Sequence, residues 1–329
     1  MSTGEILQRI LSGDRRAIAR AMTWVENEQP GAIELLEALY PHTGRAWRIG
    51  LTGPPGAGKS TLVAALTGAL RSRGLRVGIL AVDPTSPFTG GALLGDRIRM
   101  EPHFLDEGVF IRSLATRGRQ GGLTARTEEL ADVLDAAGFD LVLIETVGVG
   151  QSELDVRQAA DSVAVVLVPG SGDTVQAMKA GLMEIADLFI LNKADHPEID
   201  ALERALKTAL QLRPPARWTP PLLRTVATGG EGIEAVLEAL NRHRAFLEAE
   251  GLWEEGRRRR LLHRVERYIA AEWERRFWTP ERRARLEALL AEAAHRRGES
   301  PYRLARRILE EPSPRAEPPL PEDQPEKRR

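Results

Sequence analysis

The spacing of hydrophobic residues changes twice along this chain of 329 residues. In roughly the first 44 residues, apolar side chains recur every three or four positions, which predicts amphipathic helices. From Trp47 onward they gather into short continuous runs, and such runs are typical of parallel strands that are covered on both faces. These runs span residues 47–52, 77–82, 109–114, 141–146, 163–168, 188–192 and 222–227, with helical patterns between several of them at 60–73, 123–137 and 199–212. The middle of the chain therefore predicts an α/β fold with a doubly wound, mostly parallel sheet.

Beyond residue 250 the helical spacing returns. One apolar stripe runs through Leu261, Val265, Ile269, Trp273 and Phe277, and a second through Leu286, Leu289, Leu290 and Ala293. Ser300-Pro301 predicts the N-cap and first position of a last short helix. We therefore predict an N-terminal helical extension over residues 1–44, an α/β domain over 45–250 and a helical arm over 251–311. The tail, 312–329, has the proline- and charge-rich composition of a disordered segment.

A glycine-rich segment follows the first predicted strand and opens the first helix of the sheet domain. It matches G-x-x-x-x-G-K-[ST] in full, the motif of a phosphate-binding loop, or P-loop. Its backbone N–H groups and the helix N-terminus would cradle a β-phosphate, the lysine would reach the β- and γ-phosphates, and the serine hydroxyl would ligate Mg²⁺. The predicted nucleotide-binding residues here are Gly53, Pro54, Pro55, Gly56, Ala57, Gly58, Lys59, Ser60 and Thr61.

A second motif, Asn192-Lys193-Ala194-Asp195, follows the strand at 188–192. The Asp195 carboxylate can accept hydrogen bonds from guanine N1–H and from the 2-amino group, neither of which adenine has, so the motif predicts GTP rather than ATP. The Asn192 side chain can reach N7 or brace the phosphate loop, and the Lys193 stem can cover the base. Thr225, Val226 and Ala227, at the end of the next strand, are expected to add a backbone contact to the base.

Acidic residues at two other strand ends suit a magnesium site. Glu145 ends the strand at 141–146 in a position where small GTPases carry Asp, and Gly148 behind it could approach the γ-phosphate. Asp83 could hold a water bound to Mg²⁺, or it could open a turn with Pro84. The loop from 85 to 100 carries Asp96, Arg97 and Arg99 and could order around the γ-phosphate. From the residues alone, we predict Ser60, Asp83 and Glu145 as metal-binding residues.

Composition excludes several other classes of protein. The chain has no cysteine, so it has no disulfide, no thiolate metal site and no cysteine nucleophile. The formal net charge of -1 gives no reason to expect a nucleic-acid or membrane partner. No apolar run approaches the roughly 20 residues that span a bilayer, and the first residues lack the apolar stretch of a signal peptide, so we expect a cytoplasmic protein.

Taken together, these segments resemble the methylmalonyl-CoA mutase-associated GTPase family of the MeaB/ArgK type, which includes the human methylmalonic aciduria type A protein. The matching segments, in order, are 53–60, 82–86, 90–100, 145–153 and 192–195. The string Glu145-Thr-Val-Gly-Val-Gly-Gln-Ser-Glu153 is the most specific of them. The resemblance covers roughly residues 1–250 well and the C-terminal helices loosely.

The resemblance implies a G-protein of the SIMIBI class that forms a homodimer, with the helical arm taking part in dimerisation. It implies a chaperone for an adenosylcobalamin-dependent acyl-CoA mutase, which gates cofactor loading, protects the mutase and has a slow GTP hydrolysis that the mutase stimulates. By the same resemblance, Asp83, Asp96 and Glu145 serve the Mg²⁺ and nucleotide site, and Lys59, Asp96 and Glu145 are the expected catalytic residues. Residues 169–179 resemble a switch that signals to the mutase, with Asp173, Gln176 and Lys179 as expected signalling residues beside Arg99; from the residues alone, this loop also fits a helix N-terminus capped by Asp173.

Two other functions remain as alternatives. A phosphotransferase (kinase) acting on a transport or other protein would need an acceptor site, for which the sequence offers no signal. A metal-insertion GTPase would be expected to carry Cys or His clusters, whereas this chain has no Cys and only six dispersed His. We expect the chain itself to bind no cobalamin, because no Asp-x-His-x-x-Gly segment occurs.

Overall fold

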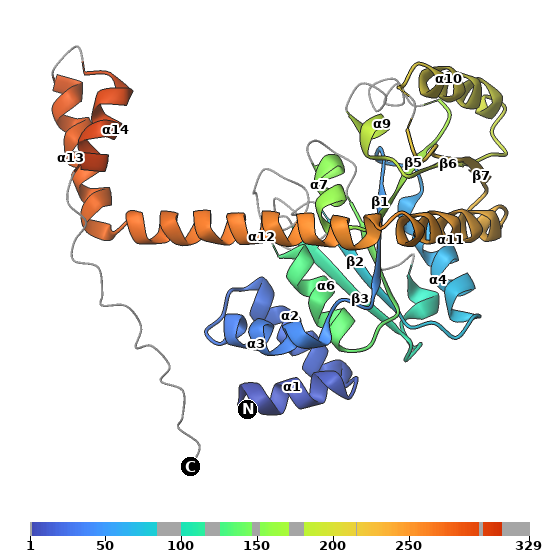
Figure 1. Cartoon of the computed structure of the whole chain (residues 1–329), viewed down its shortest axis with the longest axis horizontal. Coiled ribbons are helices and arrows are strands. Elements are labelled where there is room, and N and C mark those ends of the chain that lie inside the picture. Colours follow the sequence, from blue (N-terminus) through green and yellow to red (C-terminus); the bar gives the residue numbers. More distant parts are fainter. Residues whose placement is uncertain are drawn as a thin grey trace. The chain divides into compact units, whose positions relative to one another are not determined.

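The computed structural model describes residues 2–83, 100–115, 126–146, 152–170, 181–214, 216–295 and 299–310. Its centre is a seven-stranded sheet with the order β3-β2-β4-β1-β5-β6-β7, and every neighbouring pair is parallel (Figure 1). The predicted strands are confirmed to within two residues at each end. The strands are β1 (Trp47–Thr52), β2 (Val77–Asp83), β3 (Val109–Ala115), β4 (Leu141–Glu145), β5 (Ser162–Leu167), β6 (Leu188–Asn192) and β7 (Leu222–Thr225).

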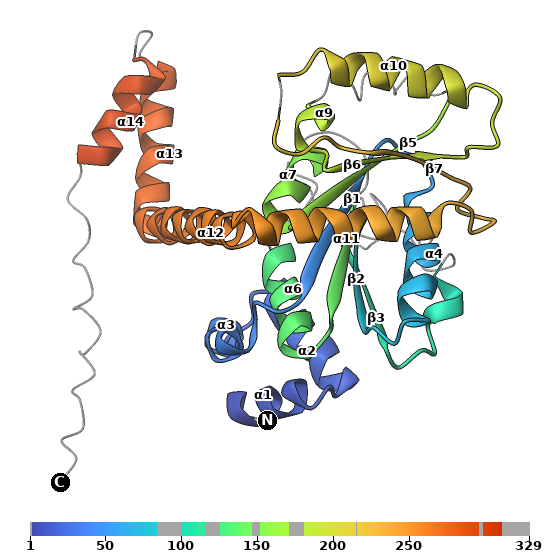
Figure 2. The same ribbon diagram turned by 45° about the vertical axis from the view of Figure 1, so that its right-hand side comes forward.

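Helices cover both faces of the sheet, which confirms the doubly wound α/β fold (Figure 2). Alternate residues of one strand enter different cores: Val142 and Ile144 of β4 face one side, while Leu141 and Leu143 face the other. This alternation explains why the strands read as continuous apolar runs. One face is covered by α6 (Thr127–Ala136), α7 (Ser152–Ala159), α9 (Leu182–Ile185) and α10 (Ile199–Gln211), and the other by α4 (Lys59–Arg71) and α11 (Ile233–Ala249).

The N-terminal helices share the first of these cores. They are α1 (Thr3–Leu11), α2 (Arg15–Glu26) and α3 (Ala32–Leu39), followed by the 3-10 turn η1 (Tyr40–His42). Asp135, at the end of α6, accepts hydrogen bonds from the backbone N–H groups of Gly44 (2.7 Å), Arg45 (3.1 Å) and Ala46 (2.9 Å). These three bonds fix the chain that joins the N-terminal helices to β1.

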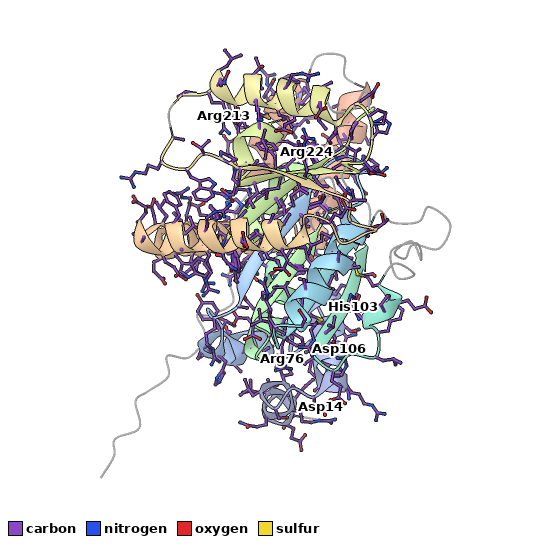
Figure 3. The ribbon with its side chains drawn as sticks, turned by 90° about the vertical axis from the view of Figure 1, so that its right-hand side faces the viewer. Asp14, Arg76, His103, Asp106, Arg213 and Arg224 are labelled. Atoms are coloured by element: carbon purple, nitrogen blue, oxygen red, sulfur yellow. The ribbon has the colours of Figure 1, made fainter. Side chains whose placement is uncertain are left out.

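The amino-terminal edge of the sheet is held by polar contacts between loops. Arg76, just before β2, donates from its backbone N–H to Asp140 Oδ2 at 2.7 Å. Asp106, which follows the 3-10 turn η2 (Glu101–His103), pairs with Arg71 at the end of α4 at 2.8 Å. Figure 3 labels Arg76 and Asp106 at this end of the molecule. The carboxyl ends of the strands lie at the opposite end of the sheet, and ligands of open α/β sheets bind at that end.

The described part of the chain forms two compact units, which divide between Arg257 and Arg258. The helix α12 (Leu252–Phe277) begins in the first unit, where Arg257 donates to the carbonyl oxygens of Gly44 and Ala46. In the second unit, α13 (Pro280–His295) and α14 (Pro301–Glu310) pack through Leu289, Leu304 and Ile308. The predicted N-cap is confirmed, since the Ser300 hydroxyl accepts from Arg303 N at 3.4 Å. The domain limits drawn from the sequence stay predictions.

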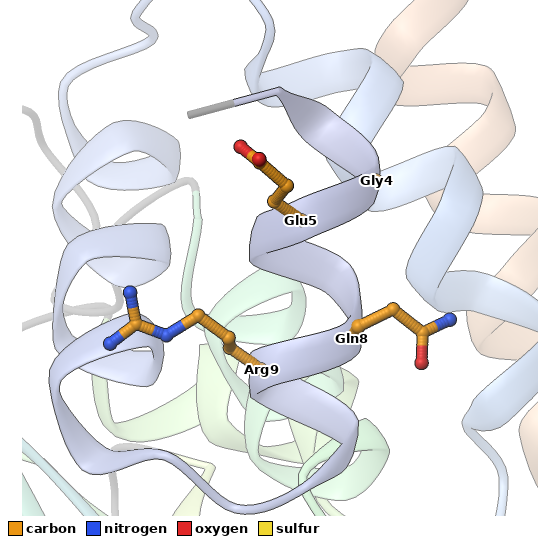
Figure 4. A pocket seen from close by; sticks show the side chains of 4 residues that line it. All are labelled: Gly4, Glu5, Gln8 and Arg9. Atoms are coloured by element: carbon orange, nitrogen blue, oxygen red, sulfur yellow. The ribbon is translucent and has the colours of Figure 1, made fainter.

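None of the described helices is both long and apolar enough to cross a membrane. A shallow depression on the exposed side of α1 is lined by Gly4, Glu5, Gln8 and Arg9 (Figure 4). Its charged groups already serve the helix, because Glu5 accepts from Ser2 N at 2.8 Å and Arg9 pairs with Asp14 at 2.6 Å.

Candidate nucleotide site

The glycine-rich segment lies between the end of β1 and the start of α4, as the sequence predicts. Three of its glycines, Gly53, Gly56 and Gly58, have positive φ angles of 137°, 76° and 83°. A Cβ at Gly53 would lie 2.0 Å from the carbonyl oxygen of Val166, and a Cβ at Gly58 would lie 2.4 Å from Asn192 Nδ2. Glycine is therefore required at these two positions both by conformation and by close contact.

The Lys59 ammonium lies inside the loop that precedes it. Its Nζ donates to the carbonyl oxygens of Gly53 at 2.8 Å and Pro54 at 3.1 Å, and the residue is only 7% exposed. A buried ammonium beside the N-terminus of α4 makes this a strongly anion-attracting site. The loop can therefore hold the phosphates of a nucleotide.

Ser60 and Glu145 meet directly beside the loop. The Ser60 hydroxyl donates to Glu145 Oε1 at 2.6 Å, and both residues are buried. They come together because β1 and β4 are neighbours in the sheet, with Leu51 opposite Glu145. A hydroxyl and a carboxylate at this spacing are hard oxygen donors of the kind that Mg²⁺ prefers, so the residues present fit the metal. Asp83 ends β2, the strand on the other side of β4; its side chain lies outside the described part of the chain.

The Asn192 side chain makes three buried hydrogen bonds. Its Nδ2 donates to the carbonyl oxygen of Ala57 in the phosphate loop at 2.9 Å. Its Oδ1 accepts from the Thr225 hydroxyl at 3.1 Å and from Ala227 N at 3.2 Å. Of the two arrangements that the sequence left open for Asn192, the structure shows the brace of the phosphate loop.

The rest of the second motif forms the turn that leaves β6. Lys193 has a positive φ of 56°, which is uncommon for a residue with a side chain. Ala194 N donates to the Thr225 carbonyl at 3.0 Å, so the turn is tied to β7. Lys193 and Asp195 are both exposed, which leaves their side chains accessible to a base. Thr225 ends β7, and Thr225 and Ala227 bond to Asn192 beside this turn; their contact to the base stays a prediction.

Asp96, Arg99, Gly148, Asp173, Gln176 and Lys179 lie outside the described residues. The structure therefore brings together the phosphate loop, Ser60 with Glu145, and Asn192 with residues 225–227.

Sequence reasoning missed one pair of polar residues at the site. The Thr146 hydroxyl donates to the Thr52 hydroxyl at 2.9 Å, and both residues are buried. The available signal was that a threonine closes each of two apolar runs. That signal does not reveal that the two strands are neighbours, so the contact could be found only in the folded chain.

Comparison with known proteins agrees with this geometry. The model of the family described as "Methylmalonyl Co-A mutase-associated GTPase MeaB" matches residues 18–282. A Pyrococcus abyssi protein, named as a GTPase, is 51% identical over 270 residues, which cover 81% of this chain and 83% of the relative. The mouse mitochondrial methylmalonic aciduria type A homolog is 36% identical over 275 residues, 78% of this chain and 66% of that protein.

A solved structure extends the likeness to the fold. The crystal structure of an LAO/AO transport system kinase superposes with a TM-score of 0.70 and 29% identity, covering 94% of this chain and 96% of the other. The match over 18–282 includes the phosphate loop, Glu145 and the Asn192–Asp195 motif. The chain therefore belongs to the MeaB family of methylmalonyl-CoA mutase-associated GTPases, and it is a GTP hydrolase.

Proposed function

We propose that the chain is a magnesium-dependent GTPase that acts as a G-protein chaperone for an adenosylcobalamin-dependent acyl-CoA mutase of the methylmalonyl-CoA mutase type. In this role it gates the loading of the mutase with its cofactor and protects the mutase from inactivation. The observation that carries the proposal is the family match over residues 18–282, whose described function is association with that mutase. In this proposal the cobalamin is bound by the mutase.

The phosphate end of GTP is assigned to the loop from Gly53 to Thr61. Lys59 exchanges its two carbonyl partners in the loop for β- and γ-phosphate oxygens. Ser60 and Glu145, which are in contact, would hold Mg²⁺, with Asp83 and Asp96 as further acids of the same site. Bound there, Mg²⁺ would neutralise charge on the β- and γ-phosphates.

The guanine end is assigned to Asp195, with the Lys193 stem over the base and residues 225–227 beside it. Asn192 contributes through its hold on the phosphate loop. Hydrolysis is an in-line attack of water on the γ-phosphorus, in which the bond to the β–γ bridging oxygen breaks and GDP and phosphate leave. The protein's part is to position the phosphates and balance their charge, with Lys59 reaching the γ-phosphate and Gly148 approaching it through its backbone N–H.

The decisive experiment measures GTP hydrolysis with and without a B12-dependent acyl-CoA mutase from the same source. We expect slow hydrolysis alone and faster hydrolysis with the mutase. γ-Labelled GTP adds a further readout, since a chaperone releases label as free phosphate whereas a kinase transfers it to protein. If the mutase neither binds the chain nor changes the rate, the mutase proposal fails and the GTPase assignment stands.

A matched variant tests the base assignment. In Asp195→Asn the side-chain amide can donate to the 2-oxo group of xanthine and still accept from N1–H. We therefore expect the variant to lose affinity for GTP and to gain affinity for XTP, by at least tenfold each. Equal weakening toward both nucleotides would place Asp195 outside the base site.

Two finer parts of the proposal have their own tests. Arg99, Asp173, Gln176 and Lys179 are assigned to signalling, so Lys179→Ala should keep the basal rate and lose the stimulation by the mutase. The homodimer is assigned to the arm, where α12 exposes Leu262, Ile269 and Trp273. Sedimentation equilibrium of the wild type and of a triple Ser variant at these positions would show whether the arm holds two chains together.

A further inference from the structure

The pair of threonine hydroxyls beside the phosphate loop lies where two segments of the site leave the sheet. Thr52 is the last residue of β1, directly before Gly53, and Thr146 is the first residue after β4. Their hydroxyl oxygens are 2.9 Å apart, and the residues are 0% and 1% exposed. The backbone repeats the link, because Thr146 N donates to the Leu51 carbonyl at 3.0 Å.

Successive residues of a strand point to opposite faces of a sheet. Glu145 accordingly turns toward α4, where it meets Ser60, and Thr146 turns toward the face that carries Ile144 and Val142. The dipeptide at the end of β4 is therefore tied to the phosphate-loop region on both faces, by the Ser60 contact on one and by the Thr52 hydroxyl on the other.

The core residues on the face that carries the Thr52–Thr146 contact are apolar and do not require hydroxyl groups as neighbours. On this face of the sheet, Val142 and Ile144 of β4 and Val165, the β5 residue opposite Thr52, belong to an apolar core. Valine has the shape of threonine, and replacing both partners of a buried hydrogen bond by apolar groups of the same shape can be nearly neutral for stability. The hydroxyls supply direction instead: a hydrogen bond holds two side chains at one distance and angle, which an apolar contact does not.

We propose that Thr146 is a positioning residue for GTP hydrolysis, and that Thr52 is its partner. Their hydrogen bond holds the end of β4 at a set distance from the phosphate loop, and so holds the Glu145 carboxylate in reach of Ser60. This inference rests on the metal-site roles proposed for Ser60 and Glu145. A displacement of about 1 Å in a catalytic group can cost 100-fold in rate, so a small slip of this strand end would be measurable.

The test compares three variants of the full chain: Thr146→Ser, Thr146→Val, and Thr52→Val with Thr146→Val. For each we would measure kcat for GTP hydrolysis, Kd for GDP without Mg²⁺, and the melting temperature. We expect the two valine variants to lose at least tenfold in kcat while Kd for GDP changes less than about threefold. Thr146→Ser, which keeps the hydroxyl, should stay within about threefold of the wild type in kcat.

The double variant keeps the test valid if Thr146→Val alone unfolds, because it leaves no hydroxyl buried without its partner. We expect it to melt within about 4 °C of the wild type, a shift that corresponds to a small change in stability. A double variant that is stable and hydrolyses GTP at the wild-type rate overturns the proposal. So does one in which kcat, GDP affinity and melting temperature fall together, since that would mark a purely structural pair.

A separate variant distinguishes this failure from failure of the metal site. Glu145→Gln should weaken the response of hydrolysis to Mg²⁺ concentration. If Glu145→Gln responds to Mg²⁺ as the wild type does, the metal assignment is wrong whatever the threonine variants show. If it is impaired and the double valine variant is not, the metal site stands and the positioning role is rejected.

Discussion

The side-chain amide of Asn192 donates a hydrogen bond to the carbonyl oxygen of Ala57 at 2.9 Å. Asn192 ends β6, whereas Ala57 lies in the loop after β1, so the bond crosses from the base-recognition motif to the phosphate loop. Asn192 Oδ1 also accepts from the Thr225 hydroxyl and from Ala227 N. This single buried side chain therefore joins three segments of the site. The segment proposed to bind the base is therefore joined by hydrogen bonds to the phosphate loop and to β7.

The first prediction follows from that link. Asn192→Ala removes the donor to Ala57 and the acceptor for Thr225 and Ala227, so the phosphate loop should lose its shape as well as its tie to β7. We expect affinity for GDP to fall at least tenfold, or about 1.4 kcal/mol. Affinity for inorganic tripolyphosphate, which has no base, should fall with it; isothermal titration calorimetry measures both.

Asp195→Asn is the matched control, because it alters the base contact and leaves the brace in place. It should bind tripolyphosphate as the wild type does. Unchanged tripolyphosphate binding in Asn192→Ala would show that Asn192 acts on the base and not through the loop.

The second prediction compares two glycines of the phosphate loop. Gly58→Ala and Gly56→Ala both place a side chain at positive φ, which costs roughly 1–2 kcal/mol. Only at Gly58 does the new Cβ meet another atom, Asn192 Nδ2 at 2.4 Å; at Gly56 nothing lies within 4 Å. Urea unfolding without nucleotide should therefore show Gly58→Ala to be less stable than Gly56→Ala by at least about 1 kcal/mol. Equal losses would contradict the clash.

The third prediction concerns a buried chain of hydrogen bonds at the amino-terminal end of β5. Trp47 Nε1 donates to the Ser162 hydroxyl at 3.1 Å, so that hydroxyl can donate to His243 Nδ1 at 2.8 Å. The Nε2 of His243 then carries the hydrogen that faces Asp187 Oδ1 at 3.4 Å. Ser162→Ala leaves the buried Trp47 Nε1 and His243 Nδ1 without the hydroxyl that both bond. It should therefore lower the free energy of unfolding by roughly 2–4 kcal/mol.

Two further observations check that prediction. GTP hydrolysis by folded Ser162→Ala should match the wild type, because Ser162 begins its strand and the nucleotide site lies at the other edge of the sheet. Thr208→Ala serves as control, since its hydroxyl is exposed and bonds only within α10, and it should change stability by less than about 0.5 kcal/mol. A Ser162→Ala loss no larger than this control would refute the network.

The fourth prediction is a pH dependence. The hydrogen bond from Arg71, followed by one from Gly108 N, holds the pKa of Asp106 below its usual value near 3.8. A lowered folded-state pKa adds stability that is present above the unfolded pKa and is lost as the pH falls through the folded pKa. The stability difference between wild type and Asp106→Asn should therefore be constant from pH 7 to about 5 and shrink below about pH 4.

The size of this effect is limited by solvent. Both side chains are about a quarter exposed, at 24% and 29%, so we expect under about 1 kcal/mol at pH 7 and less in high salt. The asparagine can still accept from Gly108 N, whereas the charge and the hydrogen bond from Arg71 are lost together. Chemical unfolding of both proteins from pH 7 to 3 measures this difference, and a difference that grows on acidification would contradict a lowered pKa for Asp106.

Features that depend on neighbouring residues in the chain could be predicted from the sequence, whereas contacts between distant segments could not. All seven strands were predicted because continuous apolar runs follow directly from burial on both faces, and the phosphate loop because its spacing reflects one compact turn. The two roles open to Asn192 could not be separated, since the choice depends on where Ala57 lies after folding. The threonine pair was missed for the same reason.

The sequence by itself determined the α/β fold, the phosphate-loop motif and the Asn192–Asp195 motif. Each of these depends on residues that are close together in the chain, so a local pattern is enough to recognise it. Only the tertiary structure decided that Glu145 meets Ser60, that Asn192 braces the loop and that Thr146 meets Thr52. The physical reason is the strand order, in which β4 and β5 flank β1 although 88 residues separate the ends of β1 and the start of β4. Hydrophobic runs set which segments become strands; which strands become neighbours depends on how all the helices pack over both faces at once.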